Sequence, residues 1–122
     1  MIDPASFKNV RLRGGFVITD IQFTDAPMLD ALEREVVAQT RITGREFRVL
    51  IQGGLSDHEL SISLYHEILE AATVGSWPPP DSLLKFNEGD FERAAQAAHG
   101  EWGAVTPENL NRMLQFYGFH EE

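Results

Sequence analysis

The stretch of residues 56–75 reads SDHELSISLYHEILEAATVG and carries the clearest structural signals of the chain. Ser56 and Glu59 form an S-x-x-E capping box, in which the hydroxyl and the carboxylate bind the free backbone N–H groups at the start of a helix. Gly75 suits the position just after a helix, and the three prolines of residues 78–80 prevent its continuation. The stretch therefore predicts a helix over residues 56–74.

This predicted helix has a broad apolar side and a narrower polar face. His66 and Glu70 lie one turn apart on the polar face, whereas Glu67 projects from the shoulder of the apolar side. Two ligands four residues apart can converge on one metal ion, because their Cβ atoms are only ~5–6 Å apart. A carboxylate directly after the first ligand can then accept a proton from water as a general base. A solvated polar face without any metal explains the same pattern.

The rest of the chain predicts a small sheet with further helices. In order, the patterns indicate an extended segment over residues 10–23, a helix over 26–40, an extended segment over 45–52, a helix over 88–98, and a last helix between Thr106 and Gly118. This order of elements indicates an α+β fold, with a small β-sheet and helices packed on it.

The charges divide the chain into two unequal parts. Residues 1–48 carry seven basic and seven acidic side chains, whereas residues 49–122 carry three basic and twelve acidic ones, so the whole net charge of −9 lies in the second part. No lysine or arginine occurs between Val49 and Leu84, so local ion pairs cannot neutralise the carboxylates of the predicted helix. This distribution excludes a nucleic-acid binder that contacts phosphates through clustered basic residues.

The composition narrows the class of protein further. With 122 residues, of which 43% are hydrophobic and 24% charged, we expect a single globular domain over residues 1–122. The lack of cysteine excludes disulfides, a thiolate nucleophile and a cysteine zinc site. No apolar run approaches the ~20 residues of a membrane span, and no secretory leader opens the chain, so we expect a cytoplasmic protein without a membrane partner. The motifs of serine hydrolases, phosphate-binding loops and dinucleotide sites do not occur.

Residues 65–71, with the sequence YHEILEA, resemble the H-E-x-x-H active-site helix of the zincin-type metallopeptidases. The resemblance is closest to the small gluzincin-type group, in which an aliphatic strand precedes that helix and a later helix supplies a glutamate. Here residues 90–95, with the sequence DFERAA, have the shape of that later helix. The resemblance is strongest over residues 45–99. It departs from the family at Glu70, where the family has histidine, so the motif in this chain is H-E-x-x-E.

The resemblance implies a zincin-like domain that acts as a metal-dependent hydrolase on peptides or proteins. His66, Glu70 and Glu92 would be the metal ligands, and Glu67 would be the catalytic base. His99 lies seven residues after Glu92 and is an alternative third ligand. Zinc is the expected ion, and manganese or iron would compete well because a His/Glu/Glu set is harder than the set of the family.

Two alternatives remain open at this point. Glu67 can instead be a buried acid that pairs with an arginine of the first part, namely Arg11, Arg13 or Arg48. The whole chain can also be a catalytically inactive, acidic zincin-like module that binds a basic protein partner. By the same resemblance, residues 45–52 would form an edge strand that binds an extended peptide.

Overall fold

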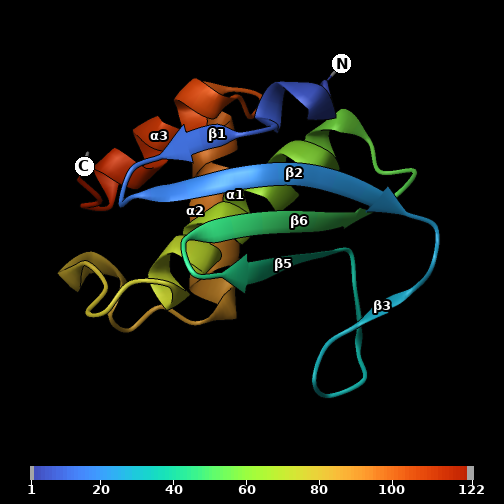
Figure 1. Cartoon of the computed structure of the whole chain (residues 1–122), viewed down its shortest axis with the longest axis horizontal. Coiled ribbons are helices and arrows are strands. Elements are labelled where there is room, and N and C mark those ends of the chain that lie inside the picture. The colour runs from blue at the N-terminus through green and yellow to red at the C-terminus, as the bar shows by residue number, and fades with distance from the viewer. Residues whose placement is uncertain (1, 121–122) are drawn as a thin grey trace.

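Four strands form one mixed sheet in the computed structural model, which describes residues 2–120 (Figure 1). They are β1 (Val10–Leu12), β2 (Phe16–Thr24), β5 (Ala38–Thr43) and β6 (Glu46–Gln52), in the spatial order β1-β2-β6-β5. β2 and β6 run parallel, and the two outer strands pair antiparallel with their neighbours. In β6, Phe47, Val49 and Ile51 are buried and alternate with more exposed residues, which is typical of a strand with one covered face.

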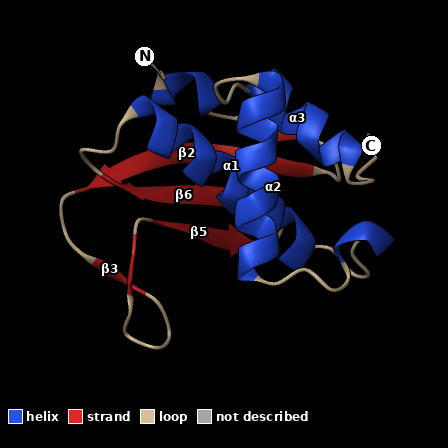
Figure 2. Cartoon of the chain, turned by 180° about the vertical axis from the view of Figure 1, so that it is seen from behind, coloured by secondary structure: helices blue, strands red, loops and turns tan. Residues whose placement is uncertain are grey.

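Three helices cover one face of this sheet, as the view from behind shows (Figure 2). They are α1 (Asp57–Val74), α2 (Glu88–Trp102) and α3 (Pro107–Phe116), and two short 3-10 helices, η1 (Pro4–Phe7) and η2 (Asp81–Leu83), complete the set. The core lies between the sheet and the helices, where Leu64, Tyr65 and Ile68 of α1 are fully buried. The α+β class with a small sheet and packed helices is therefore confirmed. Within residues 2–120, no helix combines the length and the apolar character needed to cross a membrane.

The start of α1 follows the capping box that the sequence predicts. The backbone N–H of Glu59 donates to the Ser56 hydroxyl over 3.1 Å, and the backbone N–H of Ser56 donates to the Glu59 carboxylate over 3.3 Å. The helix ends at Val74, as predicted. Local signals at both ends thus determine the length of the helix that carries His66 and its neighbours.

We expect Ser56→Ala to lower the free energy of unfolding by about 1 kcal/mol, because the N–H of Glu59 then loses its acceptor. Urea denaturation measures this change. Ser63→Ala, in the middle of the same helix, is the matched control and should leave stability unchanged. Equal losses for the two variants would show that the capping box contributes nothing specific.

The helix predicted over residues 88–98 is longer in the structure. α2 begins after Asn87, whose side chain accepts from the backbone N–H of Asp90 over 2.9 Å, and it runs through Gly100 to Trp102. The stop is Gly103, whose φ of 86° lies in the left-handed region that favours glycine. Gly100 is tolerated inside the helix and does not end it.

The helix predicted over residues 26–40 does not exist. This segment forms a short hairpin of β3 (Met28–Leu29) and β4 (Glu35–Val36), followed by β5. The carboxylate of Asp30 accepts from the backbone N–H groups of Leu32 and Arg34, over 2.8 and 2.9 Å, and Glu33 has a φ of 61°, which no α-helix accommodates. We refer to residues 25–37 as the β3–β4 arm, which projects beyond the edge of the sheet (Figure 2).

The expectation that residues 45–52 form an edge strand is also wrong. These residues correspond to β6, which lies inside the sheet between β2 and β5. The edge strand on this side is β5, because residues 38–43 are extended rather than helical. The edge nearest to α1 therefore belongs to a segment that the sequence patterns assigned to a helix.

Candidate metal centre and its pocket

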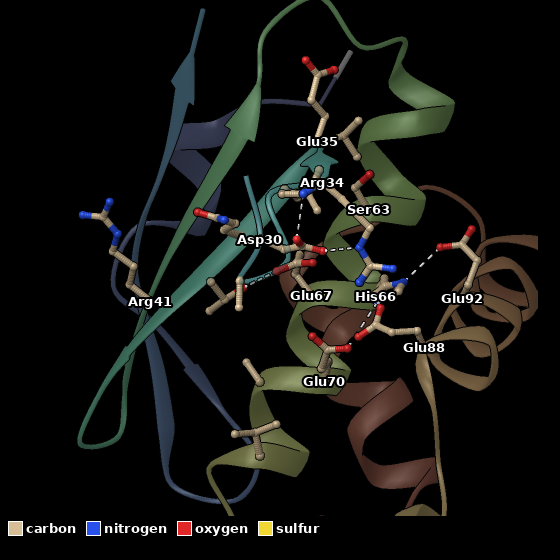
Figure 3. A pocket seen from close by; sticks show the side chains of 18 of the residues that line it. Asp30, Arg34, Glu35, Arg41, Ser63, His66, Glu67, Glu70, Glu88 and Glu92 are labelled. Atoms are coloured by element: carbon tan, nitrogen blue, oxygen red, sulfur yellow. Dashed lines mark hydrogen bonds and ion pairs between the residues drawn. The ribbon is translucent and has the colours of Figure 1, made fainter. Parts of the chain in front are cut away.

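A pocket of about 1000 Å³ lies between the β3–β4 arm, β5, α1 and the start of α2 (Figure 3). Its polar side chains come from all four of these elements. They are Asp30, Arg34 and Glu35 of the arm, Gln39, Thr40 and Arg41 of β5, Ser63, His66, Glu67 and Glu70 of α1, and Glu88 and Glu92 of α2. The predicted motif thus lines this pocket.

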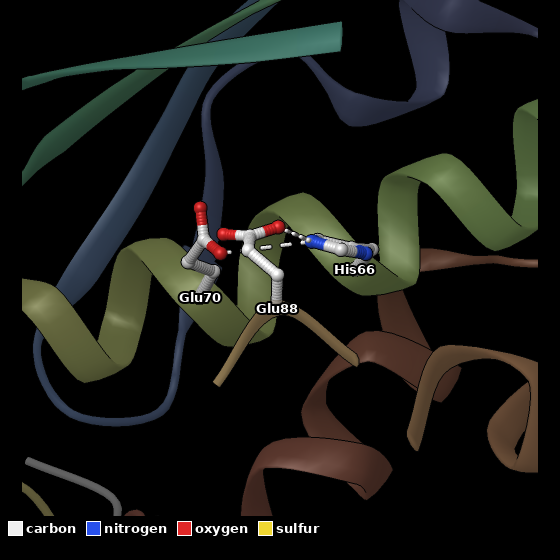
Figure 4. Close-up of side chains that lie close together, drawn as sticks. All are labelled: His66, Glu70 and Glu88. Atoms are coloured by element: carbon white, nitrogen blue, oxygen red, sulfur yellow. Dashed lines mark hydrogen bonds and ion pairs between the residues drawn. The ribbon is translucent and has the colours of Figure 1, made fainter. Parts of the chain in front are cut away.

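His66 is the centre of a cluster of three glutamates, of which Figure 4 shows Glu70 and Glu88, and Figure 3 also shows Glu92. Its Nε2 lies 3.2 Å from a carboxylate oxygen of Glu88 and 3.6 Å from one of Glu70. Its Nδ1 lies 3.0 Å from a carboxylate oxygen of Glu92. The His66 side chain is only 15% exposed, so these contacts are partly shielded from water. Two helices therefore place carboxylates at both nitrogens of one imidazole.

These contacts change the proton affinities of the cluster. Burial favours the neutral form of His66, but hydrogen bonds to Glu70 and Glu92 outweigh it and raise the pKa of His66 to about 9. The hydrogen bond between the carboxyls of Glu70 and Glu88 raises the pKa of Glu88 to about 7. The hydrogen bond from His66 lowers the pKa of Glu70. In the metal-free protein, a protonated His66 therefore balances part of the negative charge at neutral pH.

The stability of the metal-free protein should depend on this proton. Since the pKa of His66 rises to about 9 from its ordinary 6.5, its stabilising contribution is complete below pH 6.5 and is lost as the pH rises through 9. We expect the free energy of unfolding to fall between pH 7.5 and pH 9.5 by at most about 2 kcal/mol.

Urea denaturation in the presence of a chelator measures this fall. His66→Gln should remove most of it, whereas His120→Gln, at an exposed position, should retain it. A wild-type stability that stays constant or rises over this interval would contradict the assigned protonation of His66.

One donor atom from each of His66, Glu70 and Glu88 lies within 4.8 Å of the other two. Atoms that bind one zinc ion at ~2.0–2.2 Å lie roughly 3–4 Å apart, so small side-chain shifts bring this set into coordinating range. An imidazole nitrogen and two carboxylates also suit zinc, manganese and iron by their chemistry. The residues present therefore fit a divalent transition-metal ion.

Glu92 occupies a different place from the one that the family resemblance implies. It faces Nδ1, whereas Glu70 and Glu88 face Nε2 on the other side of the ring. Its second oxygen accepts from Gln96 over 2.9 Å, which holds the carboxylate in place. A carboxylate on the second nitrogen of a ligating histidine fixes the ring orientation and the tautomer. The structure thus brings Glu88, which sequence reasoning did not assign to the site, to the side where Glu92 was predicted.

Glu67 points into the pocket from α1 and is more buried than the three glutamates around His66 (Figure 3). Burial raises the pKa of its carboxyl, and one of its oxygens accepts from the Thr40 hydroxyl over 2.9 Å. Within residues 2–120 no arginine pairs with it, and Arg48 instead contacts Asp20 over 3.2 Å. The alternative of an acid paired with an arginine is therefore wrong.

His99 lies apart from this cluster, with a partner of its own. Its Nδ1 is 2.8 Å from the hydroxyl of the buried Ser61, which in turn accepts from the backbone N–H of Val105 over 2.9 Å. Its ring also packs edge-on against His58, with 4.6 Å between the ring centroids. These contacts connect α1 to the segment after α2, which is a structural arrangement.

No family model, no curated protein and no solved structure matches this chain. The arguments for a function therefore come from the residues of the pocket.

Proposed function

We infer that the protein is a metal-dependent hydrolase of zincin-like character that cleaves peptide or amide bonds. The observation that carries this proposal is the group of three donor atoms within 4.8 Å, placed in a pocket of about 1000 Å³ beside the half-buried carboxylate of Glu67. The ion would be held by His66, Glu70 and Glu88, with zinc preferred and manganese or iron as competitors. Glu92 would orient the imidazole of His66 through Nδ1.

The reaction would divide the work between the ion and Glu67. A divalent ion would supply a Lewis acid that polarises the amide carbonyl and lowers the pKa of water towards ~7. Glu67 would accept one proton of the attacking water as the new carbon–oxygen bond forms. It would then transfer that proton to the amide nitrogen as the carbon–nitrogen bond breaks. Thr40 would hold the Glu67 carboxylate through the 2.9 Å hydrogen bond, so β5 contributes a positioning residue.

The substrate would lie along β5 as an extended peptide. β5 is the edge strand beside α1, and Thr40 connects its middle to Glu67. Unpaired backbone groups of an edge strand can bind an added strand. This placement brings a peptide backbone to the residues that would cleave it.

Cleavage of a fluorogenic peptide library tests this function. Activity is expected after purification without chelator, is expected to disappear when a chelator removes the metal, and is expected to return with one equivalent of zinc. A library left intact by the zinc-loaded, manganese-loaded and iron-loaded protein would contradict the proposal.

One observation supports a second candidate function for the protein. Because a protonated His66 lies among three glutamates, it offsets part of their negative charge without an ion. This arrangement suits an inactive, acidic zincin-like module that binds a basic protein partner. The substitution Glu70→His, which restores the family motif, separates the two functions. If it creates metal binding and peptidase activity that the natural chain lacks, the natural chain is the inactive form.

A further inference from the structure

Several of the exposed large apolar side chains of the described residues gather around one pocket. Leu32, Val37, Ile42 and Val74 line it, and they are 71%, 50%, 38% and 70% exposed. They come from three elements, the β3–β4 arm, β5 and the end of α1. Apolar side chains that several elements direct to one hollow are typical of a binding surface, since exposing them to water is unfavourable.

The wall of the pocket that faces the arm is acidic. The lining contains six carboxylates, two arginines and His66, an excess of three negative charges when His66 is protonated and of four when it is neutral. Of the two arginines, Arg34 is paired with Asp30 over 2.9 Å, and Arg41 projects away from the helices on the far side of β5 (Figure 3). A divalent ion would offset only two of the four charges. The pocket therefore favours a ligand that carries positive charge, with or without the ion.

The pocket has an apolar wall, formed by the arm, and an acidic wall, formed by the helices. These two walls suit a particular arrangement of ligand side chains. In an extended segment, successive side chains point to opposite sides. A segment that passes between the arm and the helices therefore directs one side chain toward Leu32 and Val37 and the next toward Glu88 and Glu92. An aliphatic residue next to a basic residue satisfies both walls at once.

We propose that this pocket binds an extended peptide segment in which a large aliphatic side chain is adjacent to a lysine or an arginine. The aliphatic side chain packs against the apolar residues of the arm and of α1, and the basic group lies near the carboxylates of α2. Cleavage of such a segment rests on the proposed function, whereas its binding does not, because both walls exist without an ion.

Three blocked peptides test the inference on the full chain in the presence of a chelator. The first is acetyl-Ala-Lys-Leu-Ala-Ala-amide, the second has serine in place of leucine, and the third has glutamate in place of lysine. Each is titrated into ¹⁵N-labelled protein, and the amide shifts report the affinity and the place of binding. We expect the first peptide to bind about ten-fold more tightly than either of the others and to shift residues of the arm, β5 and α1.

Substitutions in the lining of the pocket test the same binding, with the peptide kept constant. Leu32→Asp combined with Val37→Asp should weaken the binding of the lysine–leucine peptide about ten-fold or more. Phe116→Asp is the matched control, since Phe116 is also 71% exposed but lies on α3, outside the lining. This control should bind with wild-type affinity.

Equal affinities for the three peptides, no binding at millimolar concentration, or an equal effect of Phe116→Asp would overturn the inference. The peptide comparison uses the natural chain, so a folding defect of a variant cannot account for it. Peptide selectivity without metal uptake would contradict the proposed hydrolase and would support the peptide-binding pocket. Metal uptake without peptide selectivity would contradict the peptide-binding pocket and would leave the proposed hydrolase possible.

Discussion

Glu88→Gln is expected to weaken zinc binding by more than about 100-fold, because it removes one of three anionic or imidazole donors. Glu92→Gln should weaken it by roughly 10–100-fold, since Glu92 orients His66 from the Nδ1 side without belonging to the donor group. The two residues lie one turn apart on α2, so the pair of variants is closely matched in charge and in position. Competition titration against a zinc-binding dye measures both affinities.

The relative size of these two losses of affinity distinguishes the ligand set proposed from the geometry, with Glu88, from the set that the family resemblance implies, with Glu92. If Glu92→Gln abolishes binding and Glu88→Gln leaves it intact, Glu92 is the third ligand and the arrangement around His66 changes when the metal binds. If neither variant alters the affinity, the ion does not bind at this cluster.

Glu67→Gln is expected to lower the rate of peptide cleavage by about 10²–10⁴-fold, because the amide cannot accept the proton of water. Zinc affinity should stay close to that of the natural chain, since Glu67 does not belong to the donor group. The amide oxygen can still accept from Thr40, so the local packing is retained. Steady-state kinetics on the best peptide of the library, together with a zinc titration, measure both quantities.

Glu59→Gln provides the control for this variant. It makes the same chemical change on the same helix, and glutamine still completes a capping box, so cleavage and zinc affinity should both be unchanged. A Glu67→Gln protein that cleaves at the natural rate would show that this carboxylate is not the base.

The part of the fold that depends on local signals was predictable. The capping box at Ser56, the glycine at residue 75 and the apolar periodicity between them determine α1 within one residue. The arm could not be predicted in this way. Its apolar residues also fit a helical spacing, and the competing signals are the turn held by Asp30 and the pairing of residues 38–43 with β6. The pairing is a tertiary interaction that the periodicity of one segment does not reveal.

The residues of the site also differ in whether local signals or tertiary packing determine their positions. The helical period alone brings His66 and Glu70 to one face, and the structure confirms that their side chains lie 3.6 Å apart. Glu88 and Glu92 occupy the same face of α2, so only the packing of α2 on α1 decides which nitrogen of His66 each one meets. A signal was present, because two like charges one turn apart disfavour a helix unless a cation lies between them. The contact of Thr40 with Glu67 was not predicted, because the segment of Thr40 was expected to be helical.

The central claim is that His66 forms part of a metal site, and metal analysis of the purified protein tests it most directly. Protein prepared without chelator should contain one transition-metal ion per chain, and its melting temperature should fall when a chelator removes the ion. His66→Gln should contain none and should melt at the same temperature with and without zinc. A natural chain that holds no stoichiometric metal, and whose melting temperature is indifferent to zinc, manganese and iron, would contradict the account.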